Sequence, residues 1–164
     1  MPSLWLLCGQ LSKFLFEGDI VEISRTMGLD VGDKTIGVAV SDPLGLTAQG
    51  VEVISRRGLK VDIARIQQLV ESLAVALVIV GLPRSLNNTL GPQAEKVQEF
   101  VRQLEKRLKV PIQTVDERFT TTIAERSMIE GDISRKKRRL MVDRLAAQII
   151  LQGHLDRMHR RKDG

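Results

Sequence analysis

Three aspartates stand where a carboxylate is unusual, and the first of them is Asp30. It lies within the apolar segment Gly28–Gly32, which begins and ends with glycine. Side chains alternate along a strand, so Leu29 and Val31 share one face and Asp30 occupies the other, where the glycines leave open space. That arrangement suits close approach of a metal ion or a phosphate. A hydrogen bond from Asp30 to the turn at Asp33-Lys34 is the alternative, and the pattern leaves both open.

The second unusual carboxylate, Asp143, lies on the apolar face of a predicted helix. Leu140, Ala147 and Ile150 are three residues before, four after and seven after it, so all four share one side of the helix. Burial of a carboxylate on the apolar face of a helix costs on the order of several kcal/mol of folding free energy unless it is paired or bound to a metal. The alternative is an aspartate at the edge of the stripe that pairs with an arginine from elsewhere.

The third position is the pair Asp116-Glu117, which follows a predicted strand at 110–115. Ligand sites in open α/β sheets lie at the carboxyl ends of parallel strands. Adjacent residues face opposite ways, so we expect only one of the pair to face the site, and we assign Asp116 with Glu117 as its rival. The alternative is that the two acidic residues only stabilise the positive N-terminal end of the next helix.

Taken together, the three carboxylates predict a hydrolytic metal site. An all-oxygen ligand set suits Mg²⁺ or Mn²⁺ rather than Zn²⁺. Two such ions about 4 Å apart can orient an attacking water and stabilise the leaving oxygen of a phosphodiester. The sequence therefore predicts catalysis by Asp30, Asp116 and Asp143 with two divalent ions.

The elements that must position these residues follow from the hydrophobic periodicity. Short apolar runs joined by turns predict an antiparallel meander, after which helical and strand patterns alternate. The predicted order is β-β-β-α-β-α-β-α-α, with strands at 27–31, 36–41, 50–55, 76–80 and 110–115. The first predicted helix covers 63–73, and the second begins at Gly91-Pro92. The third begins at a capping box formed by Thr122 and Glu125, and the last covers 137–158. This is an α/β class, a mixed five-stranded sheet with helices on both faces, in the order of the ribonuclease H-like fold.

The positive charge is concentrated near the carboxyl end of the chain. The net charge is +5, and residues 135–164 alone carry ten Lys or Arg against three Asp. A basic run precedes the helix of Asp143 and predicts phosphate contacts that give affinity without sequence reading: Arg135, Lys136, Lys137, Arg138 and Arg139. Aromatic residues make up only 3%, too few for base-stacking platforms. Arg84, in the loop after a buried strand, is a further candidate contact, with strand termination as its alternative.

Composition and length indicate one cytoplasmic domain without a membrane span. We expect a nuclease domain over residues 27–158, a preceding extension over 1–26 that need not belong to the native domain, with Met27 as the start of translation, and a basic tail over 159–164. No apolar run approaches the roughly 20 residues needed to span a bilayer. The single cysteine fits a reducing compartment. His154 and His159 are expected to be surface residues.

The chain resembles the YqgF family of Holliday-junction-resolvase-like nucleases, which are linked to processing of the 5′ end of pre-16S ribosomal RNA. The resemblance covers about 27–155 and rests on six ordered motifs: Gly28–Gly32, Lys34–Asp42, Val80–Pro83, Gly91–Ala94, Asp116–Arg118 and Val142–Ala147. It implies a cytoplasmic hydrolase that acts in ribosome biogenesis. Its motif carboxylates fall on Asp30, Asp116 and Asp143. Glu117, Lys34 and Arg118 lie in the same motifs as second candidates.

Three other functions share parts of this pattern. A junction-resolving DNA endonuclease would use the same site on branched DNA, but needs two sites related by a two-fold axis and hence a homodimer. The sequence leaves monomer and homodimer open. A non-catalytic nucleic-acid-binding module would tolerate loss of the aspartates. A phosphotransferase of the actin and sugar-kinase class also has Asp-x-Gly on a strand, but it needs two such domains and this chain is too short.

Overall fold

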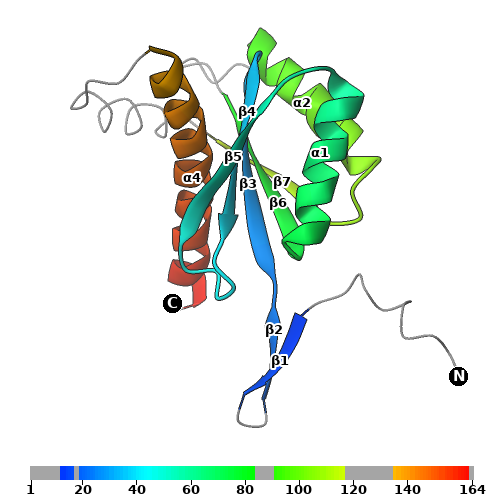
Figure 1. Ribbon diagram of the computed structural model, residues 1–164. Coiled ribbons are helices and arrows are strands. Elements are labelled where there is room, and N and C mark those ends of the chain that lie inside the picture. The colour runs from blue at the N-terminus through cyan, green and yellow to red at the C-terminus, as the bar shows by residue number, and fades with distance from the viewer. Residues whose placement is uncertain (1–11, 17–18, 84–90, 117–134, 163–164) are drawn as a thin grey trace, which may run out of the picture.

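The protein forms a five-stranded sheet with helices on both sides (Figure 1). The structure, a computed structural model, describes residues 12–16, 19–83, 91–116 and 135–162. The sheet consists of β3 (Arg25–Val31), β4 (Thr35–Ser41), β5 (Ala48–Ser55), β6 (Val75–Leu82) and β7 (Ile112–Asp116). The helices are α1 (Leu59–Ser72), α2 (Pro92–Glu105) and α4 (Arg135–Lys162). The strands β1 (Ser12–Phe16) and β2 (Asp19–Ile23) pair in a separate hairpin.

The strand order β5-β4-β3-β6-β7 confirms the predicted mixed sheet. Short connections make β3, β4 and β5 antiparallel, while the helical crossovers make β6 and β7 parallel to β3. The three parallel strands therefore end at the same edge of the sheet. The N-terminal end of α4 lies at that edge too (Figure 1).

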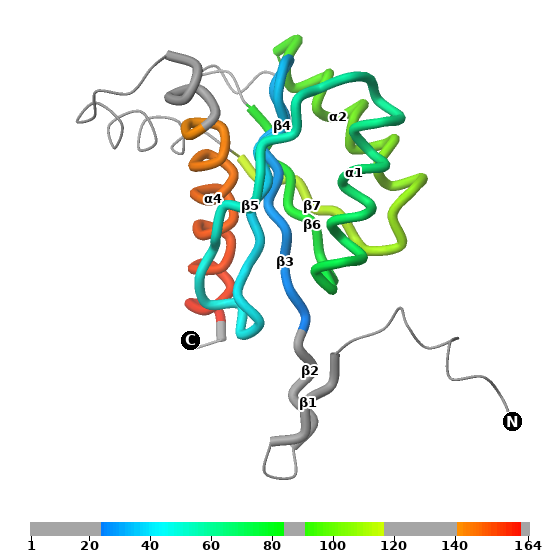
Figure 2. The backbone as a smooth tube through the Cα atoms, viewed as in Figure 1, coloured from blue at the N-terminus to red at the C-terminus, as the bar shows by residue number. Residues whose placement is uncertain are grey.

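The two faces of the sheet differ in the size of their side chains. The tube in Figure 2 shows α1 and α2 together on one face and α4 alone on the other. The α1/α2 face buries a core of large aliphatic residues, among them Met27, Leu29, Ile36, Ile66 and Leu104. The α4 face buries a smaller cluster, to which the sheet contributes Ala39 and Ala48 and the helix contributes Ala147, Leu151 and Leu155. The small side chains allow α4 to approach the sheet closely.

Glycines on the sheet make this approach closer still. A Cβ atom built on Gly28 would lie 2.7 Å from the Leu151 Cβ, and one built on Gly50 would lie 2.5 Å from the Arg144 Cγ. A Cβ atom on Gly37 would collide with the main-chain carbonyl of Asp143. The backbone of α4 thus rests on positions of the sheet that hold no side chain.

The element boundaries depart from the predicted ones at both ends of the domain. β3 begins at Arg25, so Met27 is a fully buried strand residue paired with Val40 rather than the start of the element. α4 extends to Lys162, four residues beyond the predicted end, and takes in most of the predicted tail. The helix predicted from Thr122 lies outside the described residues. Among the described helices, none is long and apolar enough to cross a membrane.

The contact between Gly37 and α4 can be tested by adding one methyl group. Gly37→Ala should lower the free energy of unfolding by about 1–3 kcal/mol, because the new Cβ meets a main-chain carbonyl that only a shift of α4 can move. Gly153→Ala is the matched control on α4, where the nearest atom to the added carbon, on Arg157, is 4.0 Å away. We expect this control to stabilise the protein by up to about 1 kcal/mol. Urea denaturation measures both, and an unaffected Gly37→Ala variant would contradict the packing.

Candidate active site

Asp30 and the main chain of Asp143 are neighbours on the α4 face of the sheet. Asp30 is on the same face of β3 as Gly28, and its register partner in β4 is Gly37. Directly opposed residues of antiparallel strands have Cβ atoms about 4.5–5.5 Å apart. Because the Asp143 carbonyl occupies the place of a Gly37 side chain, the Asp30 side chain emerges beside the main chain of Asp143. The glycine in β4 is therefore what brings these two aspartates together.

The carboxylate of Asp143 is held by the sheet. Thr35, the first residue of β4, donates its hydroxyl hydrogen to Asp143 Oδ2, with 2.5 Å between the oxygens. Both residues are half-buried. The predicted alternative, a pairing of Asp143 with an arginine, does not occur among the described residues. The partner that the structure gives Asp143 is a hydroxyl group.

Asp116 lies at the exposed end of β7, in register with Leu82. Leu82 belongs to the core that α1 and α2 cover, and neighbours in register share a face of the sheet. The register thus places Asp116 on the face opposite Asp30. In agreement, no three His, Cys, Asp or Glu residues in the described part of the chain gather closely enough to hold a metal ion. The structure brings Asp30 and Asp143 together and does not bring Asp116 to them.

The other predicted site residues divide into exposed and undescribed ones. Lys34 is exposed in the turn between β3 and β4. Glu117, Arg118 and Arg84 lie outside the described residues. The basic run forms the first turn of α4, from Arg135, and its side chains also lie outside the described part, so its contacts stay a prediction.

A polar network on the opposite side of the sheet fixes the hairpin that follows Asp30. Asp62 of α1 is fully buried and accepts hydrogen bonds from the Arg56 guanidinium (3.2 Å) and from the Arg57 main chain (3.0 Å). The same guanidinium donates to the Gly32 carbonyl (3.0 Å) and lies over the ring of Phe100, 5.3 Å from its centre. A buried carboxylate paired in this way stabilises one backbone geometry. The turn directly after Asp30 is therefore tied to the main core.

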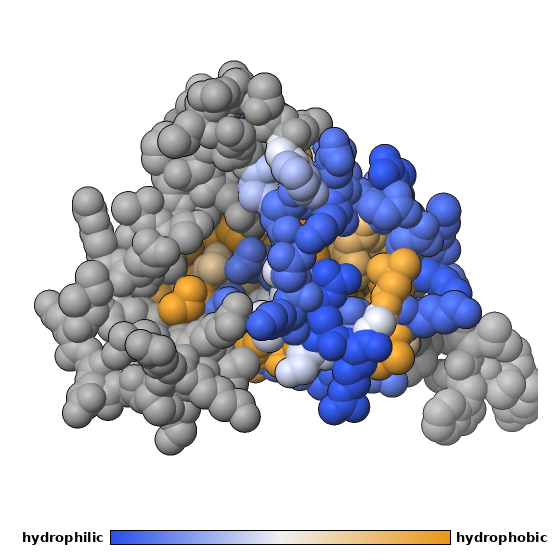
Figure 3. Space-filling view, turned by 90° about the horizontal axis from the view of Figure 1, so that it is seen from above, coloured by the Kyte–Doolittle hydropathy of each residue, from blue (hydrophilic) through white to orange (hydrophobic). Residues whose placement is uncertain are grey.

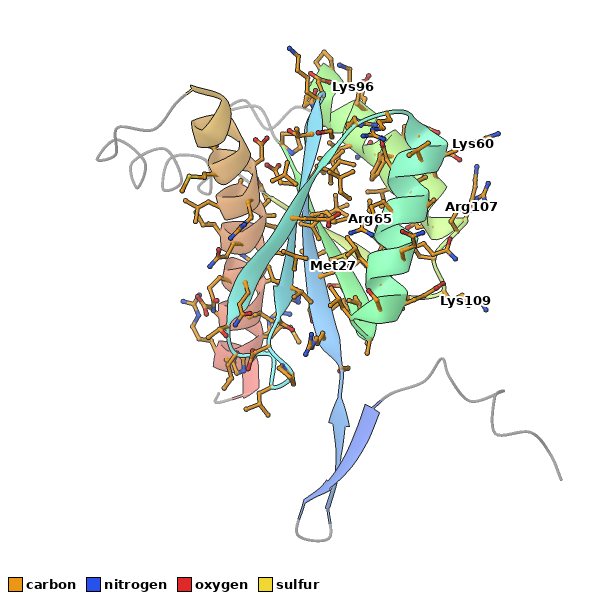
Figure 4. The ribbon with its side chains drawn as sticks, viewed as in Figure 1. Met27, Lys60, Arg65, Lys96, Arg107 and Lys109 are labelled. Atoms are coloured by element: carbon orange, nitrogen blue, oxygen red, sulfur yellow. The ribbon has the colours of Figure 1, made fainter. Side chains whose placement is uncertain are left out.

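The tip of this hairpin carries an ion pair on the surface. Lys96 of α2 donates to Asp33 Oδ1 at 2.9 Å, and its hydrogen bond and charge hold the pKa of Asp33 below the usual 3.8. Both side chains are mostly exposed, so the pair adds little stability. Figure 4 shows Lys96 at the end of the molecule where β4 begins. Seen from that end, most of the described surface is hydrophilic (Figure 3).

Sequence reasoning missed Thr35, Arg56 and Asp62. Asp62 shows the signal that singled out Asp143, because Ile66, Leu69 and Val70 share its helix face and are buried. An aspartate on an apolar helix face is thus one that has a partner, and the partner of Asp62 is Arg56. Nothing in the local sequence marks Thr35, whose partner lies 108 residues away.

The comparison of the chain with family models gives one match over most of its length. The model described as "RuvX: Holliday junction resolvase" matches residues 24–157. The chain belongs to the RuvX family.

Curated relatives of this RuvX-family chain carry the name "Putative pre-16S rRNA nuclease", and two of them illustrate the similarity. That of Moorella thermoacetica is 53% identical over 134 residues, which cover 82% of this chain and 96% of the relative. That of Clostridium novyi is 53% identical over 132 residues, covering 80% and 98%. The resemblance inferred from the motifs is confirmed. The chain is a nuclease, a hydrolase of phosphodiester bonds.

Solved structures agree on the fold of this RuvX-family member. The chain is similar to Thermus thermophilus RuvC in complex with a Holliday junction substrate, with a TM-score of 0.54 and 16% identity over 83% of this chain and 96% of that one. It is also similar to the fowlpox virus Holliday junction resolvase, with a TM-score of 0.50 and 13% identity over 81% and 99%. The predicted ribonuclease H-like fold is confirmed.

His154 corrects one expectation from the sequence, because it is buried rather than on the surface. His154 follows Ile150 and Leu151 by one helical turn, so it lies on the buried face of α4. Burial, with a smaller effect from the charge of Arg157, lowers the pKa of His154 below its usual 6.5. His159, also expected on the surface, is half-buried, and its Nδ1 lies 2.8 Å from the Leu155 carbonyl oxygen.

The lowered pKa of His154 predicts a loss of stability in acid. The unfolded chain takes up a proton at a higher pH than the folded chain does, so the free energy of unfolding should fall as pH drops through 6.5 and level off below the folded pKa. His154→Gln cannot take up this proton. Urea denaturation at pH 7.5 and pH 5.5 should therefore show a smaller acid loss in the variant than in the wild type. Equal losses would show that His154 titrates normally.

Proposed function

We propose that this protein is a divalent-metal-dependent nuclease that acts in 5′-end processing of pre-16S ribosomal RNA. Its family and its relatives' names support the substrate. The observation that supports the metal dependence is the packing of the Asp143 main chain on Gly37, the register partner of Asp30, which makes the two aspartates neighbours on one face of the sheet. Like charges this close repel unless a cation lies between them.

The side chains at this site fit a magnesium or manganese ion. Both are carboxylates, the ligand class that these ions prefer. Among the described residues, the imidazole groups that would favour zinc belong to His154 and His159, which lie further along α4 than Asp143. When bound, divalent ions lower the pKa of a water molecule and stabilise the leaving oxygen of a phosphodiester.

A third carboxylate must come from the pair at the end of β7. The register assigns Asp116 to the α1/α2 face, and successive strand residues alternate between faces. The ligand proposed here is therefore Glu117 rather than Asp116, a reversal of the order expected from the sequence. Glu117 itself lies outside the described residues.

The protein residues have separate tasks in this proposal. Asp30, from a buried strand, and Asp143, held by Thr35, offer carboxylate oxygens on rigid elements, which keeps the site geometry fixed before the substrate binds. The basic run at the start of α4 binds backbone phosphates next to the site. Binding by phosphates suits a structured RNA precursor and needs none of the aromatic platforms that the chain lacks.

A branched DNA is the second candidate substrate, because the family model is described as a Holliday junction resolvase. Resolution of a junction requires two sites related by a two-fold axis. The proposal for RNA and the one for DNA share every site residue, so only the substrate tested can separate them.

Removal of one metal ligand should separate cleavage from binding. With Mn²⁺ and a precursor 16S rRNA fragment or a four-way DNA junction, Asp30→Asn should lower cleavage by at least about 100-fold while RNA binding persists, because a ligand is lost and the basic run is intact. Asp33→Asn, an exposed carboxylate three residues away, is the control that should keep its activity. Cleavage retained by Asp30→Asn would refute the site, and cleavage of the junction alone would refute the RNA substrate.

The same assay distinguishes the two candidates at the end of β7. Glu117→Gln should lose cleavage to a similar extent as Asp30→Asn. Asp116→Asn should retain most of it, because its register partner Leu82 lies in the α1/α2 core. The reverse result would show that the alternation of β7 does not decide the third ligand.

The basic run predicts a change in the salt dependence of RNA binding. Replacement of Lys136, Lys137, Arg138 and Arg139 by Gln should weaken binding and flatten the plot of log K against log[salt] by about 0.7–0.9 for each phosphate that is no longer neutralised. The control carries the same charge change at the exposed residues Lys60, Lys106, Arg107 and Lys109. Figure 4 shows Lys60, Arg107 and Lys109 on the side of the molecule away from α4. Equal slopes for the two variants would move the binding surface away from α4.

A further inference from the structure

Thr35 connects the hairpin next to Asp30 to the carboxylate of Asp143. Its Oγ1 lies 2.5 Å from Asp143 Oδ2, a separation typical of a hydroxyl that donates to an ionised carboxylate. Within the described residues, the other oxygen, Oδ1, accepts no hydrogen bond. One oxygen of the carboxylate is thus held by a hydroxyl of the sheet.

The main chain at Thr35 is held in place by the turn that precedes it. The Thr35 carbonyl accepts a hydrogen bond from the Gly32 main chain (2.9 Å), which closes the turn after Asp30. The Gly32 carbonyl in turn accepts the Arg56 guanidinium, which buried Asp62 anchors. Because Thr is β-branched, its χ1 angle has few accessible values on a strand. The position of Asp143 Oδ2 is therefore set by the same hairpin that carries Asp30.

We propose that Thr35 is a positioning residue of the metal site, whose hydroxyl fixes the orientation of the Asp143 carboxylate so that Oδ1 binds a divalent cation together with Asp30. The inference rests on the proposed function of this site. Hydrogen bonds to ligating carboxylates keep a ligand in its binding orientation before the metal arrives, and their loss costs roughly 10–100-fold in metal affinity. Thr35 therefore contributes to metal affinity without touching the metal or the substrate.

A purely structural connection between β4 and α4 would have a different signature. Loss of such a connection lowers the free energy of unfolding but leaves the metal affinity of the folded protein unchanged. Ser41, at the other end of β4, provides that comparison, because its buried Oγ accepts a hydrogen bond from the Thr26 main chain at 2.9 Å and no carboxylate is involved.

The test measures Mn²⁺ binding directly, from the electron paramagnetic resonance signal of the free ion, together with unfolding in urea. Thr35→Val keeps the shape and removes the hydroxyl, whereas Thr35→Ser keeps the hydroxyl. We expect Thr35→Val to raise the Kd for Mn²⁺ by about 10–100-fold, Thr35→Ser to stay within about threefold of wild type, and Ser41→Ala to lose stability with no change in Kd. In the cleavage assay at fixed Mn²⁺, Thr35→Val should lower kcat and leave the KM for RNA unchanged.

Asp30→Asn is measured in parallel so that two failures can be told apart. If the wild type binds Mn²⁺, Asp30→Asn loses it and Thr35→Val binds as tightly as the wild type, the metal site stands and the role of Thr35 is refuted. An equal loss of affinity in Thr35→Ser and Thr35→Val refutes that role as well, because the hydroxyl would then be irrelevant. A wild-type protein that binds no Mn²⁺ overturns both the proposed function and this inference.

Discussion

The site depends on how closely α4 packs on the sheet. On this face the strands offer glycine and alanine, and the main chain of Asp143 occupies the space of the missing Gly37 side chain. A side chain at position 37 would push the helix outward and carry Asp143 away from Asp30. Two neighbouring aspartates repel each other unless a cation offsets their charge, so the elements that carry them must be fixed by the rest of the fold.

The other face of the sheet supplies that rigidity. Large aliphatic residues under α1 and α2 form the main core, and the chain from Asp62 through Arg56 to the Gly32 carbonyl ties this core to the hairpin after Asp30. Thr35 continues the connection across to α4. The main core thus lies on one face of the sheet and the proposed metal site on the other, so a substitution at the site need not weaken the core.

Sequence periodicity predicted the order of strands and helices along the chain and selected Asp30 and Asp143, because a carboxylate in an apolar pattern is visible without a structure. It did not predict what depends on register. Whether Asp116 or Glu117 shares the face of Asp30 changes with a shift of one residue in β7, and the role of Gly37 exists only because it is paired with Asp30. The bond from Thr35 spans 108 residues and has no local signature. The burial of His154 does have one, because His154 follows the buried Ile150 and Leu151 at helical spacing.

The most direct test of the account is a crystal of the wild-type protein grown with Mn²⁺ and measured for anomalous scattering. We expect a manganese ion that binds carboxylate oxygens of both Asp30 and Asp143 at about 2.1 Å, a distance typical of small hard cations. The main chain of α4 should pack on Gly37 in the same crystal. A manganese peak that lies elsewhere, or no peak between these two aspartates at saturating Mn²⁺, would contradict it.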